Sequence, residues 1–548
     1  MAIESRKSDM EEAKAVDISI EELRALRSLT HAVDDLLEES LKARESLTQT
    51  FRRIFPALLR LTGAKAIAVH TQSEDLTQQT FHEGDFGGIY PGTVLAENKW
   101  GVRKMGASTL VSQVLDVVGI SVGTIGLLFD GDQTDRSLAP KLVRMLDVIS
   151  EQLDTVLVSV QTAAEKHHLI LKFNEHLANP VFEAGMDAAV QALAQRVKLP
   201  NFALLYRDAV EGERIHYRTY KLGRLEYESG QQPFAPLEQA IKRFGPELIG
   251  RGENKLREAL GVNRAAEAVL ISGPVSSDTL GKVILWSPEN EGFSAFTLDL
   301  VRVLASTLSQ RLIDYNRERI HLSQFFANRV IDELLDDPDY RRKYLTPRDE
   351  AIGILFADIN GITRICEQVL ESPSNIGGFV DRWSEGVVRR VWDHGGVFDK
   401  MVGDCVIGLF GPPFFRSGAT DRAEAAMRCA RDIQKFTESM SADKEVARIA
   451  EIVKLPGLGV AIGVNLAPTY CGMFGPNQNY TGFSTGMNQT ARLQSLGGFR
   501  ETLVMDSVRA ALEKSADPYF KNLAYGELKE TPVKNVSHPL RYYGVGFK

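Results

Sequence analysis

The chain has 548 residues, which is enough for three to four domains at roughly 150 residues each. Hydrophobic residues make up 44% of it, and its 45 glycines and 21 prolines are too few for a low-complexity or collagen-like chain. The formal net charge of -8 gives no reason to expect a nucleic-acid partner or an anionic membrane partner. The 4 cysteines show no CxxC pairing, so we expect neither a disulfide framework nor a zinc site, and a reducing cytoplasmic setting.

The N-terminal segment is polar and acidic and lacks the apolar core of a signal peptide. The most apolar long stretch, 109–129, is interrupted by Gln113 and Asp116 and is typical of a strand, so we expect no membrane span. Residues 18–61 place apolar side chains at three- and four-residue spacing, which predicts an amphipathic helix. This helix could form a short coiled coil or pack on its own domain, and the pattern fits both equally.

Two segments further along the chain repeat each other. GTIGLLF begins at Gly123 and is followed by an apolar helical pattern from Leu142, while GKVILWS begins at Gly281 and is followed by one from Leu300. The offset is 158 residues for the strands (281 against 123) and for the helices (300 against 142). A strand followed by a long helix at one offset, twice over, predicts two copies of one domain.

The order of entering helix, mixed sheet and exit helix resembles tandem GAF sensor domains over about 45–315. The resemblance predicts an N-terminal helix at 1–44 and GAF-like domains at 45–165 and 166–315. It implies an unknown small-molecule ligand for these domains, although the sequence carries no clear NKFDE motif and no cysteine before Cys366 for a chromophore.

A continuous helical pattern connects these domains to the rest of the chain. It runs from Phe296 to Leu335 with its apolar side chains on one seam, and an Asp-Asp-Pro sequence ends it. Helices of this length between domains usually pair across a dimer. We therefore expect a transducing helix or linker at 316–344 that leads into a domain at 345–548.

The last domain begins with a pattern that brings two aspartates together. AIGILFADINGIT predicts an apolar strand that ends in Asp358, and GGVFDKMVGDCVIGLFG predicts two strands around a tight turn that holds Asp404. Either aspartate alone is more typical of a cap or a turn. Two aspartates that converge from a strand end and a neighbouring hairpin can hold Mg²⁺, which prefers carboxylate and phosphate oxygens.

Three strings in this region, ILFADINGIT, GGVFDKMVGDCVIGLFGPP and YTGFSTGMNQTARLQ, resemble a class III adenylate/guanylate cyclase catalytic domain. The match spans about 345–548 in the family's order, and LSQFFANRVIDELL before it resembles the family's transducing helix. The predicted fold class is therefore multidomain α/β, with two GAF-like α+β domains, a long signalling helix and a ferredoxin-like βαββαβ cyclase domain.

The resemblance gives roles to single residues. Asp358 and Asp404 fall on the two metal-binding aspartates, which implies two Mg²⁺ or Mn²⁺ ions. Lys400 and Thr481 fall on the two positions that read the purine. Taken alone, Lys400 could equally be a solvated lysine on a strand.

The remaining roles concern the sugar and the phosphates. Asn488 falls on the residue that orients the ribose and Arg492 on the transition-state arginine, and their four-residue spacing on a helix puts them on one face. Taken alone, Arg492 could be a surface ion pair. The resemblance also implies that backbone amides around Ile359, Asn360 and Gly361 cradle the triphosphate.

Three departures from the family pattern stand out. Ser484-Thr485 replace a usual Gly-Asp pair, Ala467 replaces a usual glycine, and Val536 stands where a lysine usually grips the triphosphate. Lys534 or Arg541 could take over that last role, and the sequence does not decide between them.

The expected function is an adenylate cyclase that converts ATP to 3′,5′-cyclic AMP and pyrophosphate, with GAF-like domains as its input. The family's sites lie between two catalytic domains, so we expect a homodimer in which one chain supplies the aspartates and its partner the base, ribose and arginine residues. The alternatives are a catalytically silent nucleotide-binding module and a guanylate cyclase. A diguanylate cyclase is excluded because the hairpin reads VGDCV rather than GG[DE]EF.

Overall fold

The computed structural model describes most of the chain, and it divides into two units, Met1–Leu171 and Lys172–Lys548. The boundary falls within helix α5 (Ala139–Leu177). The described residues are 18–43, 45–72, 78–96, 100–117, 120–133, 139–210, 214–250, 253–262, 266–273, 279–288, 292–370, 372–413, 418–532 and 539–547. No helix within these ranges is long and apolar enough to cross a membrane.

The first unit is a five-stranded antiparallel sheet in the order β2-β1-β5-β4-β3. Alternate residues of β1 face opposite ways: Ile67 and Val69 join a core with α2, α3 and α5, whereas Ala66 and Ala68 pack with α4. The elements are α2 (Ile20–Lys42), α3 (Leu47–Thr62), β1 (Ala66–Gln72), β2 (Gln78–Gly84), α4 (Pro91–Leu95), β3 (Gly101–Met105), β4 (Ser108–Val117) and β5 (Ile120–Asp130).

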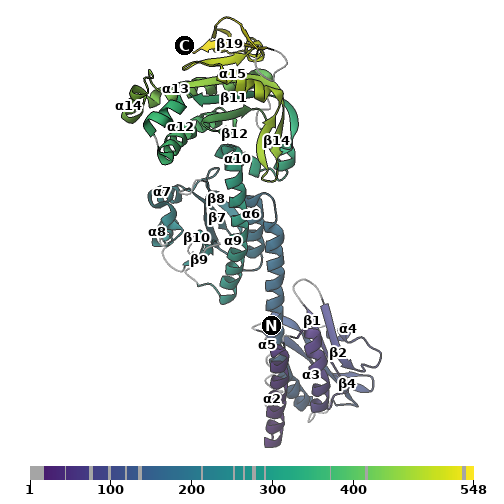
Figure 1. Ribbon diagram of the computed structural model, residues 1–548. Helices are drawn as coiled ribbons and strands as arrows, with labels where there is room; N and C mark the ends of the chain where they lie inside the picture. The colour runs from purple at the N-terminus through teal and green to yellow at the C-terminus, as the bar shows by residue number, and fades with distance from the viewer. Residues whose placement is uncertain are drawn as a thin grey trace. The chain divides into compact units, whose positions relative to one another are not determined.

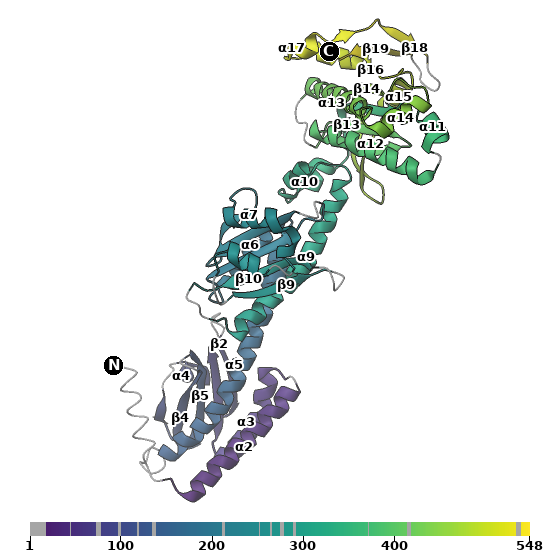
Figure 2. The same ribbon diagram turned by 90° about the vertical axis from the view of Figure 1, so that its left-hand side faces the viewer.

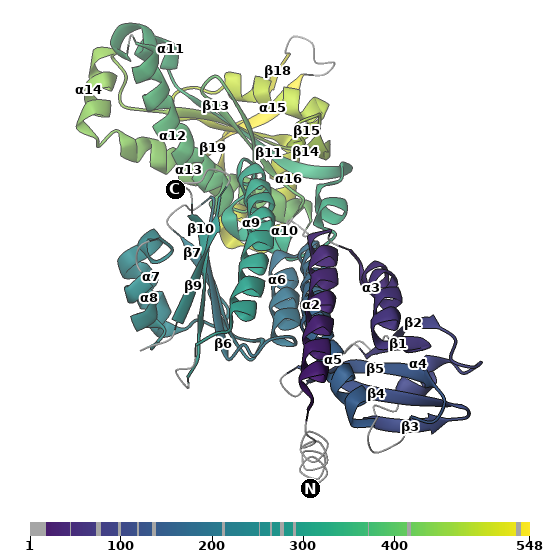
Figure 3. The same cartoon turned by 90° about the horizontal axis from the view of Figure 1, so that it is seen from below.

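The helix predicted over 18–61 is two helices, α2 and α3, that lie side by side (Figure 3). The second begins at a capping box, in which the Ser46 hydroxyl accepts from the Gln49 amide and the Gln49 side chain accepts from the Ser46 amide. The apolar side of α3 packs on the sheet and that of α2 packs against α3 in the same core, which agrees with packing on its own domain, one of the two interpretations of the sequence pattern.

The second unit begins with another five-stranded antiparallel sheet, in the order β8-β7-β6-β10-β9. Helix α9 lies along it (Figure 2). The elements are α6 (Phe182–Ala194), β6 (Asn201–Arg207), β7 (Ile215–Lys221), β8 (Arg224–Glu228), α7 (Ala235–Phe244), a 3₁₀ turn (Gly245–Leu248), α8 (Glu253–Ala259), β9 (Ala266–Ser272), β10 (Thr279–Trp286) and α9 (Ala295–Ser323).

The predicted repeat corresponds to matching strand orders. β2-β1-β5-β4 in the first sheet and β7-β6-β10-β9 in the second have the same order and are antiparallel throughout. The repeated glycines have the same local role, since a Cβ on Gly123 would lie 2.4 Å from the His70 carbonyl oxygen and one on Gly281 would lie 2.6 Å from that of Leu205. Each glycine therefore permits a neighbouring strand to approach closely.

The rest of the second unit is built on a nine-stranded sheet, with the central order β12-β13-β11-β14. This is the order of the ferredoxin-like βαββαβ arrangement that the sequence predicts, and its pairs are antiparallel. The central strands are β11 (Arg348–Ile359), β12 (Val397–Val402), β13 (Cys405–Phe410) and β14 (Val460–Phe474), followed by β15 (Asn479–Phe483), β16 (Thr502–Met505), β17 (Ala524–Tyr525), β18 (Lys529–Thr531) and β19 (Leu540–Gly546).

Helices cover both faces of this sheet. Ile462 and Val464 of β14 share a core with α12 and α13, whereas Gly463 between them faces α15, where an added Cβ would lie 2.8 Å from the Gln494 amide nitrogen. The domain is drawn in green and yellow in Figure 1. Its helices are α11 (Ile362–Ile365), α12 (Pro373–Asp393), α13 (Ala419–Met440), α14 (Lys444–Ile452), α15 (Thr485–Ser495), α16 (Asp506–Leu512) and α17 (Pro518–Lys521).

The helix predicted from Phe296 to Leu335 is not continuous. α9 ends at Ser323 and a separate helix, α10 (Asn328–Leu335), follows. The break has a structural cause: the Phe325 carbonyl accepts hydrogen bonds from the Phe398 amide (3.0 Å) and the Trp392 indole (2.9 Å), so the chain leaves the helical path to contact the domain built on the nine-stranded sheet.

Candidate functional site

The two predicted aspartates meet at one end of the central strands. Asp358 lies at the end of β11, and Asp404 lies in the tight turn between β12 and β13, where Gly403 has φ 65°. The Asp404 carboxylate accepts a hydrogen bond from the Ile359 amide at 3.1 Å, and Gln494 of α15 donates to Asp358 at 3.4 Å. The hairpin and the helix thereby hold both carboxylates in place.

The electrostatics of this pair suit a cation. Burial, the charge of Asp404 and a hydrogen bond to Asp404 together raise the pKa of Asp358 to about 7, while the hydrogen bond from Gln494 opposes the rise. Among the described residues no cluster of three or more His, Cys, Asp or Glu side chains surrounds a possible metal. Two carboxylates with room for substrate oxygens fit Mg²⁺, which is usually held by one or two carboxylates and phosphate groups.

We expect the affinity for Mn²⁺ to depend on pH, because a proton on Asp358 competes with the metal. With a pKa of about 7 for Asp358, affinity should rise about fivefold from pH 6 to pH 7 and less than twofold from pH 7 to pH 8. Titration calorimetry at the three pH values measures this, with Asp358→Asn as control. Equal affinities at pH 6 and pH 7 would contradict it.

The same raised pKa predicts how the metal-free protein responds to pH. The folded state keeps the Asp358 proton up to about pH 7, while an unfolded chain releases it near its ordinary value of 3.8. Folding therefore takes up a proton between these values, so the free energy of unfolding should fall as pH rises through this window.

Lys400 and Thr481 also meet. The Lys400 ammonium donates to the Thr481 hydroxyl at 3.1 Å, which joins β12 to β15. Thr481 is buried, whereas the Lys400 side chain is 48% exposed. The two residues that the resemblance places at the purine therefore form one polar pair.

Asn488 and Arg492 share one exposed face of α15, as their spacing predicts. Gln494, which contacts Asp358, lies on another side of the same helix. Successive α-helical residues are about 100° apart, so Arg492 and Gln494 differ by about 200°. Within one chain, Asn488 and Arg492 thus point away from the aspartate pair.

The amides proposed to cradle a triphosphate are partly in use. The Ile359 amide donates to Asp404, and the Asn360 amide donates to the Gly459 carbonyl at 2.9 Å. Gly361, at φ 75°, begins the short helix α11. Two of the three amides thus have partners within the chain, and the triphosphate cradle that the resemblance implies around Ile359, Asn360 and Gly361 stays a prediction.

The departures have local structural explanations. Ser484 caps α15 by accepting from the Met487 amide at 3.1 Å. Ala467 fills the space over Gly486, where an added Cβ would lie 2.3 Å from the Ala467 methyl group. Val536 and Lys534 lie outside the described residues, and Arg541 pairs with Glu530 at 3.2 Å.

Two residues at the site were missed from the sequence. Nothing in the sequence marks Gln494 among the residues of α15, because its contact with Asp358 depends on how that helix packs. Asp399 precedes Lys400 and is fully buried beside it, with 3.6 Å between the Asp399 carboxylate and the Lys400 ammonium. A charged residue at a strand position gives no signal of burial from sequence alone.

Comparison with known proteins identifies a family for the part of the chain that holds this site. Residues 345–543 match the family described as the adenylate and guanylate cyclase catalytic domain. The chain is 29% identical over 203 residues to the uncharacterized protein Rv1319c of Mycobacterium tuberculosis, covering 36% of this chain and 34% of that protein. It is 26% identical over 196 residues to the uncharacterized protein Rv1318c of the same organism, covering 35% of this chain and 33% of that protein. The chain spans about a third of the length of these curated relatives.

Solved structures also match part of the chain. The adenylyl cyclase CyaB from P. aeruginosa is 24% identical and covers 37% of this chain and 97% of that chain, with a TM-score of 0.32. The guanylyl cyclase Cya2 is 21% identical and covers 36% of this chain and 93% of that chain, with a TM-score of 0.31. On the family match, residues 345–543 of this chain are an adenylate/guanylate cyclase catalytic domain.

Proposed function

We propose that the chain is an adenylate cyclase that converts ATP to 3′,5′-cyclic AMP and pyrophosphate. The observation that carries the proposal is the pairing of residues within one chain: Asp358 with Asp404, and Lys400 with Thr481. A nucleotide cyclase needs carboxylates for metal-bound phosphates and a separate polar pair for the base, and this domain provides both.

The proposed reaction is an in-line attack of the ribose 3′-oxygen on the α-phosphorus. A bond forms between these atoms, the bond from the α-phosphorus to the bridging oxygen breaks, pyrophosphate leaves, and the proton of the 3′-hydroxyl is released to solvent. Two Mg²⁺ or Mn²⁺ ions held by Asp358 and Asp404 would lower the pKa of the 3′-hydroxyl and neutralise phosphate charge. Asn488 orients the ribose, and the guanidinium of Arg492 stabilises the charge that develops on the α-phosphate.

A homodimer would complete each site. Because Asn488 and Arg492 point away from the aspartates of their own chain, they can serve the aspartates of a partner. Large apolar side chains are exposed on the hairpin, on nearby strands and in the turn after α15, which suits a surface that a second copy covers: Met401, Val402, Tyr470, Phe483 and Phe499. Such a symmetric dimer contains two equivalent sites.

Regulation by the two N-terminal sheets, as GAF-like domains with an unidentified small-molecule ligand, is part of the proposal. Arg319 of α9 is 1% exposed and bonds both Asp208, just after β6, at 3.0 Å and Asp332 of α10 at 2.6 Å. Beyond the break, the Phe326 ring packs edge-on against Tyr480, with 5.4 Å between centroids. Tyr480 adjoins Thr481, so this chain of contacts runs from the second sheet to the base-reading pair.

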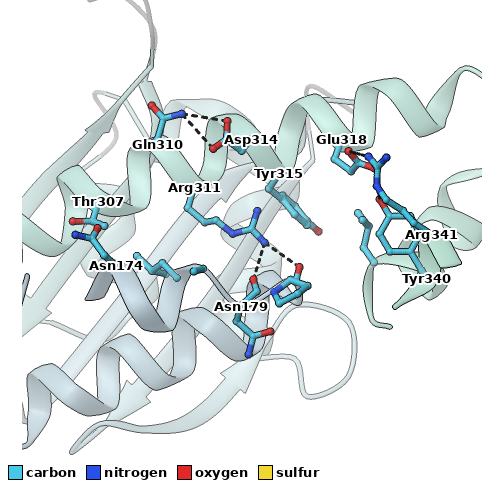
Figure 4. Close-up of a pocket in the computed structure, with 14 residues that line it drawn as sticks. Asn174, Asn179, Thr307, Gln310, Arg311, Asp314, Tyr315, Glu318, Tyr340 and Arg341 are labelled. Carbon is cyan, nitrogen blue, oxygen red and sulfur yellow. Dashed lines mark hydrogen bonds and ion pairs between the residues drawn. The ribbon is translucent and has the colours of Figure 1, made fainter. Parts of the chain in front are cut away.

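A second set of contacts also fixes α9. Figure 4 shows Arg311 pointing across a groove of about 530 Å³ towards Asn179. Its guanidinium donates to the carbonyls of Asn179 and Pro180, at 3.0 Å each. In the same groove Arg341 pairs with Glu318 of α9 at 2.6 Å. If α9 moved relative to the Asn179–Pro180 turn or to Arg341, these hydrogen bonds would break. A displacement of α9 would therefore reach both neighbours, which supports α9 as the element that transmits a signal.

The test of the proposed specificity is a comparison of kcat/KM for ATP and GTP. Lys400 only donates, which suits N1 of adenine, and Thr481 can accept from the 6-amino group. At one to three kcal/mol for each well-made contact, we expect ATP to be preferred by about ten- to a hundredfold. A GTP value equal to or above the ATP value would assign the chain as a guanylate cyclase.

A further inference from the structure

Thr481 presents a chemical problem if it reads adenine. A hydroxyl has one hydrogen to donate and two lone pairs, so it can pair with the 6-amino group of adenine or with O6 of guanine. Lys400 already donates to one of its lone pairs at 3.1 Å. The direction of the hydroxyl hydrogen therefore decides whether Thr481 presents its second lone pair, which suits adenine, or its hydrogen, which suits guanine.

A buried carboxylate lies beside this pair. The Asp399 side chain has no exposed surface, and among the described residues neither of its oxygens accepts a regular hydrogen bond. Its nearest cation is the Lys400 ammonium, 3.6 Å away. Burial raises the pKa of Asp399, and the Thr481 hydroxyl and Lys400 both oppose the rise, which places the carboxylate within reach of both groups. A buried carboxylate without a hydrogen-bond donor is costly, so its position calls for a role.

The backbone explains how two consecutive residues reach the same place. In a regular strand Asp399 and Lys400 would point to opposite faces. Here the pairing of β12 with β13 shifts by one residue: Phe398 pairs with Gly408, and the next pair is Lys400 with Ile407. Asp399 therefore has no partner residue on β13 and is the extra residue of a β-bulge. A bulge re-aims a side chain, and this one brings both Asp399 and Lys400 to Thr481.

We infer that Asp399 is a positioning residue that sets the base specificity of the cyclase site by accepting the hydroxyl hydrogen of Thr481. An ionised carboxylate can only accept, so the Thr481 hydrogen turns towards Asp399 and the free lone pair turns towards the base. Thr481 then acts as an acceptor, which suits the 6-amino group of adenine and leaves O6 of guanine without a donor. Because it has no exposed surface, Asp399 acts through Thr481 and does not touch the base.

The inference rests on the proposed function and is tested by the ratio of kcat/KM for ATP to that for GTP. Asp399→Asn keeps the shape but its amide can donate to Thr481, so the ratio should fall by about tenfold, the equivalent of one hydrogen bond. Asp399→Asn with Thr481→Asp should restore the ratio to within about twofold of wild type, since a carboxylate at 481 needs no orientation. Glu385→Gln, on the exposed face of α12, is the control and should leave the ratio unchanged.

Binding of 3′-deoxy-ATP and 3′-deoxy-GTP, which cannot cyclise, gives a readout that does not require turnover. If wild-type protein cyclises ATP and Asp399→Asn leaves both ratios unchanged, the inference is wrong and the proposed function stands. If wild-type protein forms no cyclic product but its preference for 3′-deoxy-ATP falls in Asp399→Asn, the proposed function is wrong and the inference stands. A wild-type preference for guanine in both assays overturns both.

If Asp399→Asn does not fold, the same ratio of kcat/KM for ATP to that for GTP is measured on Thr481→Val. This variant removes the hydroxyl that Asp399 is inferred to orient, so the ratio should again fall by about tenfold. An unchanged ratio in a folded Thr481→Val protein overturns the inference.

Discussion

Asp404→Ala and Arg492→Ala should each lower the rate of cyclic-nucleotide formation by about a thousandfold, and mixing the two inactive proteins should restore activity. The single losses follow from removing a metal ligand or the cation that faces the transition state. In the mixture, half of the dimers are heterodimers, and one of their two sites takes its aspartates from the Arg492→Ala chain and its arginine from the Asp404→Ala chain. About a quarter of wild-type activity should therefore return.

Mixing Asp404→Ala with Asp358→Ala provides the matched control. Both changes lie in the aspartate pair, so no heterodimer contains an intact site and the mixture should stay inactive. Subunit exchange is checked by labelling the two chains with different fluorophores. Exchanged but inactive Asp404→Ala and Arg492→Ala heterodimers would show that each site belongs to a single chain.

Arg319→Met should lower the free energy of unfolding of the second unit by about 3 to 5 kcal/mol, because it leaves Asp208 buried without its main cation. Asp208 has no exposed side-chain surface, and besides Arg319 it contacts His216 at 3.1 Å. The same change removes the bond from α9 to α10, so activity should also become less responsive to any ligand of the N-terminal domains. Denaturant unfolding followed by tryptophan fluorescence measures the first effect.

Arg317→Met is the control, two residues earlier on the same helix. Its side chain is 74% exposed and its ion pair with Asp314 spans 3.7 Å, so its replacement should change stability by less than about 0.5 kcal/mol. Adding Asp208→Asn to Arg319→Met should recover part of the loss, since it removes the buried negative charge that the Arg319 guanidinium balances. Equal stability of Arg319→Met and Arg317→Met would show that the buried pair contributes nothing.

The central strands of the catalytic domain could be predicted from sequence because their signals are local. The apolar run before Asp358 and the Gly-Asp turn at Asp404 specify a strand end and a hairpin tip, and both aspartates lie where that pattern puts them. The repeat could also be predicted from sequence. Gly123 and Gly281 occupy equivalent strands, and each lies close to a backbone carbonyl oxygen of the adjacent strand. Hydrophobic periodicity and turn residues are enough to predict these strands and turns.

Features that depend on tertiary packing were not visible. The end of α9 has no Gly or Pro to mark it, because the break is caused by hydrogen bonds from Phe398 and Trp392 to the Phe325 carbonyl. Arg319 looks like a solvent-facing arginine in a charged helix, yet it is buried against Asp208. Asp399 depends on a one-residue shift in strand pairing, which no propensity specifies.

The most direct test of the account is the identity of the product that the purified 548-residue chain forms from ATP with Mg²⁺ or Mn²⁺. Phosphorus NMR and mass spectrometry distinguish 3′,5′-cyclic AMP and pyrophosphate from ADP, AMP and inorganic phosphate. We expect equimolar 3′,5′-cyclic AMP and pyrophosphate from the wild-type chain and neither from Asp404→Ala. Binding of ATP with no cyclic product above the Asp404→Ala level would contradict the account and identify the domain as a nucleotide-binding module.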